Sequence, residues 1–477
     1  MLKKSHDQKL TILYTNDIHS HFEMMSSAAA IISRERTAAQ GPVLVLDIGD
    51  HMDRAAVETE GSMGQANVDI MNLTGYDAIT IGNNEGLTFP ADVLEHLYAG
   101  LQCPVVCCNI RETTSGAPPR WMKPSIVVEK EGIRVGITGA TAAFAGFYQL
   151  LGWEASDPDQ AIAEQVRLLS DQCDLVIVLS HLGLTTDKRL AENIEGIDII
   201  LGGHTHHVLE NPLVIGGTVI CGAGKFGNYV GRLVMERSSE NDRFMSREGL
   251  LLSVDQALIE PIVEQAIMRH HELAEQRLQE QVAVIDRKLP IHYEEESPFA
   301  NLLAQAVLHH TGAEFAIVNS GQLLGPLPKG EISAGMLHSL CPSPINPCVV
   351  TLRGEHIYQA LEESLLLEFN NKKITGFGFR GYILGCLAVD GLQVHYDPSG
   401  LPYHKITSIT LGGQPLERTR EYRVGTLDMF TFKIGYETLA LGTDTAYMLP
   451  EFIRDLLREE LSRPGSLDET LVPRWIS

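Results

Sequence analysis

Short apolar runs alternate with segments of helical spacing through the first half of the chain, and this alternation constrains the fold more than any other feature. Brief apolar runs between turn signals are typical of buried strands. Such runs occupy residues 11–15, 43–46, 78–81, 105–108, 175–179 and 197–201. Residues 159–170 have the spacing of an amphipathic helix, and residues 126–138 predict a hairpin across Lys130-Glu131-Gly132. Strands and helices that alternate in this way predict an α/β domain.

A change of composition divides the chain further on. From about residue 255 to 281, Ala, Glu, Gln, Leu and Arg dominate a long polar segment of helical character. A helix candidate at residues 299–310 and a strand candidate at 315–318 follow it. We therefore predict three parts, which cover residues 1–245 (N-terminal domain), 246–285 (partly helical linker) and 286–477 (C-terminal domain).

The composition is that of a globular protein, with 44% hydrophobic residues in a chain of 477. The formal net charge of −24 should repel nucleic acid and anionic membranes away from any local patch. The eight cysteines form no Cys-x-x-Cys pair, which favours free thiols in a reducing compartment. No signal peptide is visible and the apolar runs are too short to span a membrane. We expect a cytoplasmic protein without nucleic-acid or membrane partners, and the sequence gives no indication of its oligomeric state.

Metal-capable side chains follow five of the six predicted strands. The carboxyl ends of strands in an open α/β sheet border its ligand-binding crevice. Two residues at positions i and i+2 of an extended segment also point in the same direction. The residues concerned are Asp17 and His19, Asp50, Asn83 and Asn84, His181, and His204 and His206.

The residue types suit a pair of cations. Imidazole and carboxylate groups bind zinc, manganese, iron or cobalt, and the carboxylate of Asp50 could bridge two of them. The Asn83 carbonyl would complete a ligand shell without adding charge. Two cations roughly 3.5–4 Å apart can activate a hydroxide and stabilise both the attacking and the leaving oxygen of phosphoryl transfer. Each motif alone also occurs in ordinary turns and caps, but five of them in order predict a site for two divalent metal ions.

These segments resemble the calcineurin-like metallophosphoesterases, specifically the 5′-nucleotidase/UDP-sugar hydrolase family. The matching segments are ILYTNDIHSHF, VLDIGDHMD, ITIGNNEG, VIVLSHLG and IILGGHTHH, followed by TGAEFAIVNSG and GEISAGMLHSL. The resemblance implies a four-layer α/β/β/α metallophosphoesterase domain followed by a smaller α+β substrate domain. It assigns one metal to Asp17, His19, Asp50 and His206, and a second metal to Asp50, Asn83, His181 and His204.

Two positions depart from the family near the metal ligands. The family has a His–Asp pair that stabilises the transition state, and this chain has Asn84 and Leu87 at those positions. The loss of such a group costs on the order of 10²–10⁴ in rate. Asn84 can still donate a hydrogen bond, and His51 or His21 could substitute. We therefore name Asn84 and His51 as catalytic candidates, with a purely structural role as the alternative for either histidine.

The C-terminal part departs from the family as well. The family's Asn-Gly-Gly-Gly-x-Arg loop is Asn319-Ser320-Gly321-Gln322-Leu323-Leu324 here, so its Arg is absent. The positions of the two aromatics that sandwich a base fall in residues 342–346, which contain no aromatic, and at Met429. Aromatic side chains elsewhere could replace them, although core packing is the more common role of such residues. The substrate-binding candidates are Asn319, Gly321, Asn346, Phe377, Phe379 and Arg380.

We conclude that the sequence predicts a divalent-metal-dependent phosphoester hydrolase in which a metal-bridging hydroxide attacks phosphorus. A small-molecule nucleotide or related phosphoester is the expected substrate. The alternative is a metal-binding member of the family that has lost catalysis and serves as a sensor or partner-binding protein.

Overall fold

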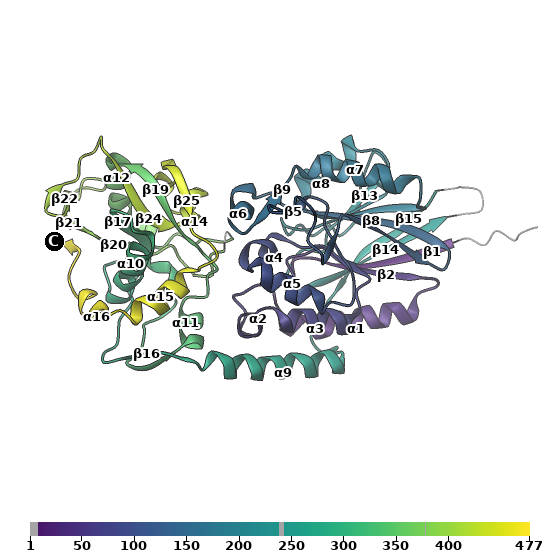
Figure 1. Cartoon of the computed structure of the whole chain (residues 1–477), viewed down its shortest axis with the longest axis horizontal. Helices are drawn as coiled ribbons and strands as arrows, with labels where there is room; N and C mark the ends of the chain where they lie inside the picture. The colour runs from purple at the N-terminus through teal and green to yellow at the C-terminus, as the bar shows by residue number, and fades with distance from the viewer. Residues whose placement is uncertain (1–7, 238–242, 377) are drawn as a thin grey trace, which may run out of the picture. The chain divides into compact units, whose positions relative to one another are not determined.

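The computed structural model describes residues 8–237, 243–376 and 378–477. The chain forms two compact units, of which the first ends at Ala274 and the second covers Glu275–Ser477 (Figure 1). The division lies within helix α9 (Pro261–Leu278). In the three described ranges, no helix has both the length and the apolar character that crossing a membrane requires.

Two sheets form the centre of unit 1. The larger has the strand order β15-β14-β1-β2-β3-β4-β6 and the smaller has the order β12-β13-β11-β10-β8-β7. The strands of the larger sheet are β1 (Gln8–Thr15), β2 (Val43–Asp47), β3 (Ala78–Ile79), β4 (Val105–Val106), β6 (Met122–Lys123), β14 (Tyr229–Arg237) and β15 (Met245–Ser253). Those of the smaller sheet are β7 (Ser125–Lys130), β8 (Ile133–Thr141), β10 (Leu175–His181), β11 (Ile199–Gly202), β12 (Leu213–Ile215) and β13 (Thr218–Cys221). A separate pair consists of β5 (Ile110–Glu112) and β9 (Trp153–Ala155).

The side chains of the central strands alternate between two cores. On β10, Ile177 and Leu179 pack with residues of the other sheet, whereas Val176 and Val178 pack against helices. On β1, Ile12 belongs to the core between the sheets. Because strand side chains alternate in direction, an apolar run without polar interruptions is buried on both faces. The continuous apolar runs in the sequence therefore mark the central strands of two stacked sheets.

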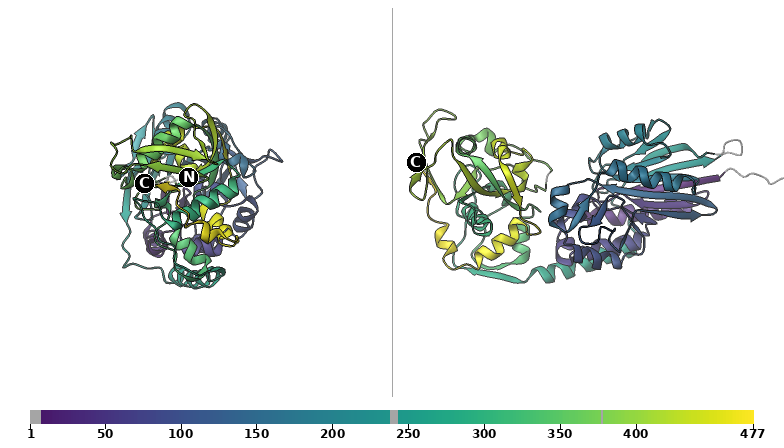
Figure 2. Two further views of the ribbon diagram at one scale, coloured as in Figure 1. Left: turned by 90° about the vertical axis from the view of Figure 1, so that its left-hand side faces the viewer. Right: turned by 45° about the horizontal axis from the view of Figure 1, so that its top comes forward.

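Helices cover the outer face of each sheet, and Figure 2 shows them on both sides of the strands. Apolar residues of α1, α3 and α5 pack on the larger sheet, and residues of α7 and α8 pack on the smaller one. The result is the predicted four-layer α/β/β/α arrangement. The helices of unit 1 before α9 are α1 (Phe22–Ala38), α2 (Val57–Ser62), α3 (Gln65–Thr74), α4 (Asn83–Thr88), α5 (Ala91–Ala99), α6 (Ala145–Leu150), α7 (Pro158–Ser170) and α8 (Leu184–Asn193).

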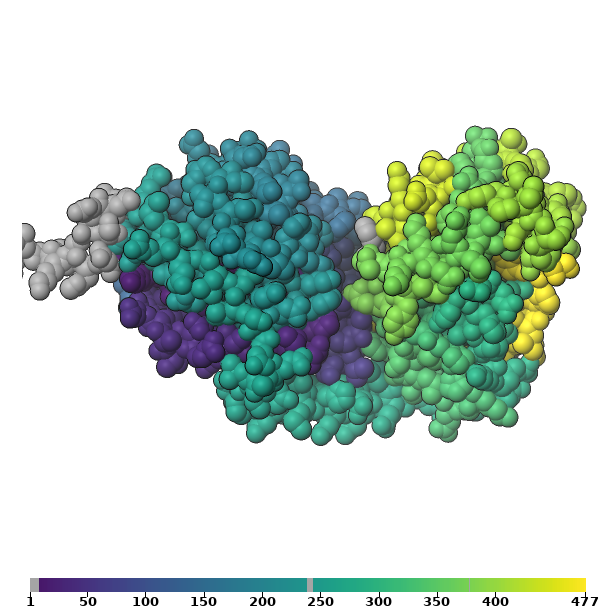
Figure 3. All heavy atoms as spheres, turned by 180° about the vertical axis from the view of Figure 1, so that it is seen from behind, coloured from purple at the N-terminus to yellow at the C-terminus, as the bar shows by residue number. Residues whose placement is uncertain are grey.

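Helix α9 lies along the outside of unit 1, where Figure 3 shows it in blue-green at the lower edge. Its two adjacent histidines contact acidic side chains of α2 and α3. His270 Nε2 lies 2.8 Å from Asp69 Oδ2, and His271 Nδ1 lies 2.8 Å from Glu58 Oε1. These histidines, which lie beside each other in the sequence, therefore attach the helix to the unit.

Unit 2 is an α+β fold with a single main core. Its five-stranded sheet has the order β20-β17-β24-β19-β25, and a four-stranded sheet has the order β23-β22-β21-β26. The strands are β16 (Gln281–Ile285), β17 (Phe315–Asn319), β18 (Gly330–Ser333), β19 (Pro347–Arg353), β20 (Leu387–Asp390), β21 (Leu392–Tyr396), β22 (Ile406–Leu411), β23 (Gln414–Pro415), β24 (Glu421–Leu427), β25 (Thr443–Tyr447) and β26 (Trp475–Ile476). The helices are α10 (Pro298–Thr311), α11 (Ala334–Leu340), α12 (Gly354–Ser364), α13 (Leu367–Asn370), α14 (Asp428–Thr431), α15 (Ile453–Leu461) and α16 (Ser466–Glu469), with two short 3₁₀ helices at Ser320–Gln322 and Glu437–Leu441.

Several local predictions agree closely with these elements, and two do not. The predicted hairpin is β7–β8, and its turn residues Glu131 and Gly132 both have positive φ. The predicted strands at 78–81 and 105–108 are too long, because β3 and β4 contain only two residues each. The chain leaves each strand early and enters the loops that follow it.

Candidate metal centre

Loops at the carboxyl ends of β1, β2, β10 and β11 bring the metal-capable residues together. β1 pairs in parallel with β2, and β10 pairs in parallel with β11, so their carboxyl ends lie at the same edge of each sheet. The two sheets are linked at this edge, because the His204 backbone N–H lies 3.1 and 3.0 Å from the carboxylate oxygens of Asp17. The sequence patterns after these four strands thus converge on one place.

The backbone at this place is unusual. Five of the seven predicted ligands have a left-handed conformation, with φ between 48° and 70°; they are Asp17, His19, Asp50, His204 and His206. Each such non-glycine residue costs about 1–2 kcal/mol, and this kind of strain tends to gather at functional sites. The assumption that Asp17 and His19 converge because they lie in an extended segment is therefore wrong. Their side chains meet because the backbone turns sharply at both positions.

One group of donor atoms consists of Asp17, His19 and His206, whose ligating atoms all lie within 4.8 Å of one another. His19 Nε2 lies 3.2 Å from His206 Nε2. His206 Nε2 lies 3.4 Å from Asp17 Oδ1. Two imidazoles and a carboxylate at these separations could bind one transition-metal ion.

A second group consists of Asp17, Asp50 and His181. His181 Nε2 lies 3.4 Å from Asp50 Oδ2, and the same carboxylate oxygen lies 3.9 Å from His19 Nε2. The Nδ1 atom of His181 lies 2.8 Å from the Ile48 carbonyl oxygen, so Nδ1 carries a hydrogen and Nε2 is the ring atom that faces Asp50. Asp17 belongs to both groups, and the Asp50 carboxylate lies within 3.9 Å of a histidine from each.

Two buried atoms near Asp50 have no hydrogen-bond partner anywhere in the described residues. They are Asn83 Oδ1 and His181 Nε2. A buried polar atom without a partner costs roughly 1–3 kcal/mol, and a cation bound to both atoms would remove that cost. The His204 ring centroid lies 5.3 Å from that of His181. A carbonyl oxygen and imidazole nitrogens are ordinary ligands of a divalent cation, so these residues fit a second metal ion.

The charges of the buried groups depend strongly on one another. Burial alone would raise the pKa of Asp50, but the imidazoles of His181 and His19 hold it well below its ordinary value. Burial opposes a charge on His181, yet the carboxylates of Asp50 and Asp17 raise its pKa to about 10. Burial and the neighbouring His181 lower the pKa of His204 to about 4. A cation at His181 would have to displace a proton, so metal binding at this place should release protons.

Glu85 holds the loops that carry these ligands. Its carboxylate accepts hydrogen bonds from the backbone N–H groups of Asp50 (3.0 Å), Met52 (2.8 Å) and Gly82 (2.8 Å). Burial, with a further contribution from Asp50, raises the pKa of this carboxyl to about 7. A single side chain thus joins the loop after β2 to the start of α4.

The two catalytic candidates have different surroundings. Asn84 lies beside the metal-ligating groups, with its backbone N–H 2.8 Å from Asp50 Oδ1. His51 is 1% exposed, and its Nδ1 lies 3.3 Å from Asn67 Nδ2 in a buried polar network. Burial lowers the pKa of His51 to about 3, so its ring is neutral. His21 lies at a more exposed position, with Nδ1 2.6 Å from Glu23 Oε1 and its ring 4.0 Å from that of Phe226.

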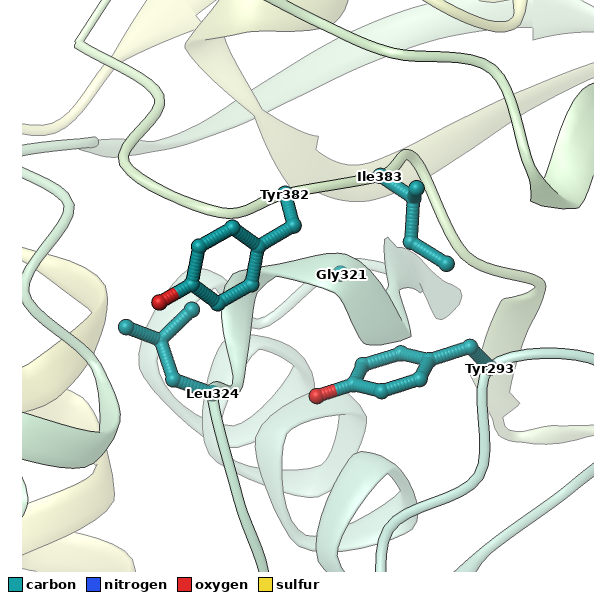
Figure 4. A pocket seen from close by; sticks show the side chains of 5 residues that line it. All are labelled: Tyr293, Gly321, Leu324, Tyr382 and Ile383. Carbon is teal, nitrogen blue, oxygen red and sulfur yellow. The ribbon is translucent and has the colours of Figure 1, made fainter.

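Unit 2 contains a pocket of about 120 Å³ that is lined by Tyr293, Gly321, Leu324, Tyr382 and Ile383. Figure 4 shows the rings of the two tyrosines on opposite sides of the pocket, with Gly321 between them. A Cβ atom on Gly321 would lie 2.0 Å from the Ile383 carbonyl oxygen, so only glycine fits there. Neither tyrosine is among the predicted substrate-binding residues, although Tyr382 lies two residues after the predicted Arg380.

The other predicted substrate-binding residues that the structure describes do not line this pocket. Asn319 is fully buried and its Nδ2 donates to the Leu384 carbonyl oxygen (2.6 Å), while Asn346 Nδ2 donates to the Glu451 carbonyl oxygen (2.8 Å). Phe379 is 4% exposed and belongs to the hydrophobic core. The Arg380 backbone N–H donates to Ser343 Oγ (3.1 Å). Phe377 lies outside the described residues.

Comparison with known proteins identifies the family to which this chain belongs. Residues 10–208 match the family described as calcineurin-like phosphoesterase, and residues 279–440 match the 5′-nucleotidase C-terminal domain. The chain is 34% identical over 461 residues to the uncharacterized metallophosphoesterase YunD of Bacillus subtilis, covering 96% of this chain and 100% of that one.

Solved structures agree on the fold. A 5′-nucleotidase precursor from Thermus thermophilus superposes with a TM-score of 0.61 at 22% identity, covering 98% of this chain and 99% of that one. The NAD nucleotidase of Haemophilus influenzae has a TM-score of 0.69 at 16% identity, covering 98% of this chain and 97% of that one. This chain therefore belongs to the 5′-nucleotidase family of calcineurin-like metallophosphoesterases and is a metal-dependent hydrolase of phosphoester bonds.

Proposed function

We propose that unit 1 binds two divalent cations, which are manganese, zinc, cobalt or iron. Asp17, His19 and His206 would hold one of them. Asn83, His181 and His204 would hold the other, with Asp50 shared between the two. When bound, such a pair activates water for attack on phosphorus and stabilises the charge of the transition state.

The observation that supports this proposal most directly is that two buried polar atoms, Asn83 Oδ1 and His181 Nε2, have no hydrogen-bond partner among the described residues. The second of them lies 3.4 Å from the Asp50 carboxylate. A divalent cation can accept lone pairs from a carbonyl oxygen, imidazole nitrogens and a carboxylate together. The ligand types also match a phosphoester hydrolase, since imidazoles and carboxylates bind the divalent cations that activate water in such enzymes.

We further propose that the substrate is a nucleotide or a related phosphoester with a flat aromatic group. The match of unit 2 to the 5′-nucleotidase C-terminal domain supports this class. The pocket between Tyr293 and Tyr382 supports it independently, because two tyrosine faces suit a planar heterocycle. Its volume of about 120 Å³ is well below that of pockets for drug-sized ligands, roughly 300–1,000 Å³, and suits one planar ring system.

An activity panel tests the proposed function. The purified protein is loaded with Mn²⁺, Zn²⁺ or Co²⁺ and assayed on nucleoside monophosphates, cyclic nucleotides, UDP-glucose, and nitrophenyl mono- and diesters. We expect turnover that is highest on one of the nucleotides and falls by at least about 10³-fold in Asp50→Ala, since this variant removes the shared ligand. Asp69→Ala is the matched control, because it removes a carboxylate that contacts His270 of α9 and Gln65 of its own helix α3, none of which is a proposed ligand.

Two outcomes would contradict the proposal. If the protein bound metal tightly but turned over no substrate of the panel, the catalytic part would be wrong. If it hydrolysed nitrophenyl esters but no nucleotide, only the substrate class would be wrong.

The free state of all eight cysteines supports a cytoplasmic location, which cell fractionation would test.

A further inference from the structure

Asn84 contacts two of the proposed metal ligands at once. It is the second residue of α4, and its backbone N–H donates to Asp50 Oδ1 at 2.8 Å. Its side-chain Nδ2 lies 2.9 Å from His19 Nδ1 and 3.2 Å from the Met52 carbonyl oxygen. The carboxamide is therefore directed at a histidine ring rather than held only by its own loop.

The His19 ring has its two nitrogens in different surroundings. Nε2 faces the donor atoms, at 3.2 Å from His206 Nε2 and 3.9 Å from Asp17 Oδ1. Nδ1 faces Asn84. The side chain of His19 is 10% exposed, so little water can reach Nδ1 in place of Asn84.

The chemistry of imidazole makes this contact important for metal binding. A neutral imidazole carries its hydrogen on one nitrogen, and the other nitrogen holds the lone pair that binds a cation. For Nε2 of His19 to bind a cation, Nδ1 must carry the hydrogen and donate it to an acceptor. The Asn84 carboxamide can supply that acceptor, because a half-turn about its last side-chain bond exchanges Nδ2 and Oδ1.

We propose that Asn84 is a positioning residue for the metal ligand His19. With Oδ1 toward the ring, it accepts the Nδ1 hydrogen, fixes the ring orientation and leaves the Nε2 lone pair free for the cation. The half-turn gives up two hydrogen bonds of the Asn84 side chain, to the Met52 carbonyl oxygen (3.2 Å) and from Asn83 Nδ2 (3.4 Å), and the bond between His19 and the cation offsets this cost. The inference rests on the proposed metal centre but not on any phosphoesterase activity.

One other side chain could hold the Nδ1 hydrogen. Asp53 Oδ2 lies 3.8 Å from His19 Nδ1, which is beyond hydrogen-bonding distance. Asp53 Oδ1 already accepts from the Ala55 backbone N–H at 2.8 Å. The side chain of Asn84, at 2.9 Å, is therefore closer to His19 Nδ1 than the carboxylate of Asp53, at 3.8 Å.

Co²⁺ titration tests the proposal, with affinity measured by calorimetry and ligand geometry by visible absorption. Asn84→Ala should weaken one of the two binding steps by roughly 10–100-fold, the usual cost of removing such an outer partner, and should alter the Co²⁺ spectrum. Asn84→Asp keeps an acceptor and should bind Co²⁺ within about threefold of the wild type or more tightly. All variants retain the backbone N–H to Asp50, so the effect reports the side chain alone.

Two control variants complete the experiment. Asn72→Ala removes a half-buried asparagine whose Nδ2 donates to the Gly100 carbonyl oxygen, and it should leave both binding steps unchanged. Asp53→Asn removes the rival carboxylate and should change Co²⁺ affinity by less than about threefold. Circular dichroism establishes that each variant is folded, and Asn84→Ser replaces Asn84→Ala if the latter is not.

The proposal is overturned if Asn84→Ala binds both Co²⁺ ions with wild-type affinity and spectrum. It is also overturned if Asp53→Asn weakens binding and Asn84→Ala does not. A variant that loses turnover while binding Co²⁺ normally would indicate that Asn84 contacts the substrate instead. An inactive wild type that binds two Co²⁺ ions would contradict the proposed function and leave this test intact.

Discussion

Gly49 lies so close to Gly82 that a Cβ atom on Gly49 would stand 2.3 Å from the Gly82 backbone nitrogen. Gly82 has as little space, because a Cβ atom on Gly82 would stand 2.0 Å from Oδ1 of Asp50, the residue after Gly49. Gly49 also has a φ of 84°, which favours glycine. The loops after β2 and β3 therefore approach each other directly beneath the proposed shared ligand.

Gly82→Ala should separate these loops. The added methyl group meets backbone and ligand atoms that cannot move independently, so we expect the free energy of unfolding to fall by roughly 1–3 kcal/mol and Co²⁺ affinity to fall as well. Chemical denaturation and Co²⁺ titration measure the two effects. Gly146→Ala is the control, because its Cβ has open space around it, and it should stay within about 0.5 kcal/mol of the wild type. If Gly82→Ala and Gly146→Ala had the same free energy of unfolding and the same Co²⁺ affinity, the close approach of the two loops would not matter for either property.

His51→Ala should affect stability more than turnover. The ring is 1% exposed and its Nδ1 lies beside Asn67 Nδ2, so its removal should lower the free energy of unfolding by about 1–3 kcal/mol. His51→Asn offers an acceptor in place of Nδ1 and should restore part of the loss. A catalytic role would instead lower kcat by about 10²–10⁴ with unchanged stability, and steady-state kinetics beside thermal unfolding would reveal that outcome.

Tyr382→Ala should weaken binding of the organic part of the substrate. Stacking of a base on an aromatic ring contributes about 1–3 kcal/mol, so we expect KM for the preferred nucleotide to rise by about tenfold while KM for glycerol phosphate stays unchanged. The side chain is 77% exposed, so the protein should remain as stable as the wild type. Tyr403→Ala, at another exposed tyrosine of unit 2, is the control. A uniform rise of KM on all substrates would exclude recognition of a planar group.

Asp428→Asn should change how stability depends on pH. Burial raises the pKa of the Asp428 carboxyl to about 7, against about 3.9 in an unfolded chain. Between pH 4 and 7 the folded protein therefore binds more protons than the unfolded chain at this group, and its free energy of unfolding should fall as the pH rises. The neutral Asn side chain removes this contribution. The free energy of unfolding of the variant minus that of the wild type should therefore be larger at pH 8 than at pH 4, by roughly 1–4 kcal/mol. Urea denaturation at several pH values measures the difference, and parallel curves for the two proteins would show that the carboxyl ionises normally.

Much of the candidate site could be predicted because its residues follow strands. The apolar runs that end at Asp50 and at His181 are local patterns, and the order of parallel strands places their carboxyl ends at one edge. The same reasoning fails inside the loops. The positive φ values at Asp17 and His19 depend on the structure around them, and no spacing rule predicts them.

The sequence by itself determined the α/β class and the set of metal-capable residues, because hydrophobic period and residue chemistry are local properties. Only the tertiary structure decided that Asn84 faces His19 and that Phe379 lies in the core. It also decided that Tyr293 and Tyr382 share a pocket. Each of these facts is a contact between segments that are distant along the chain, and such contacts arise from the packing of the whole fold rather than from any short stretch of residues.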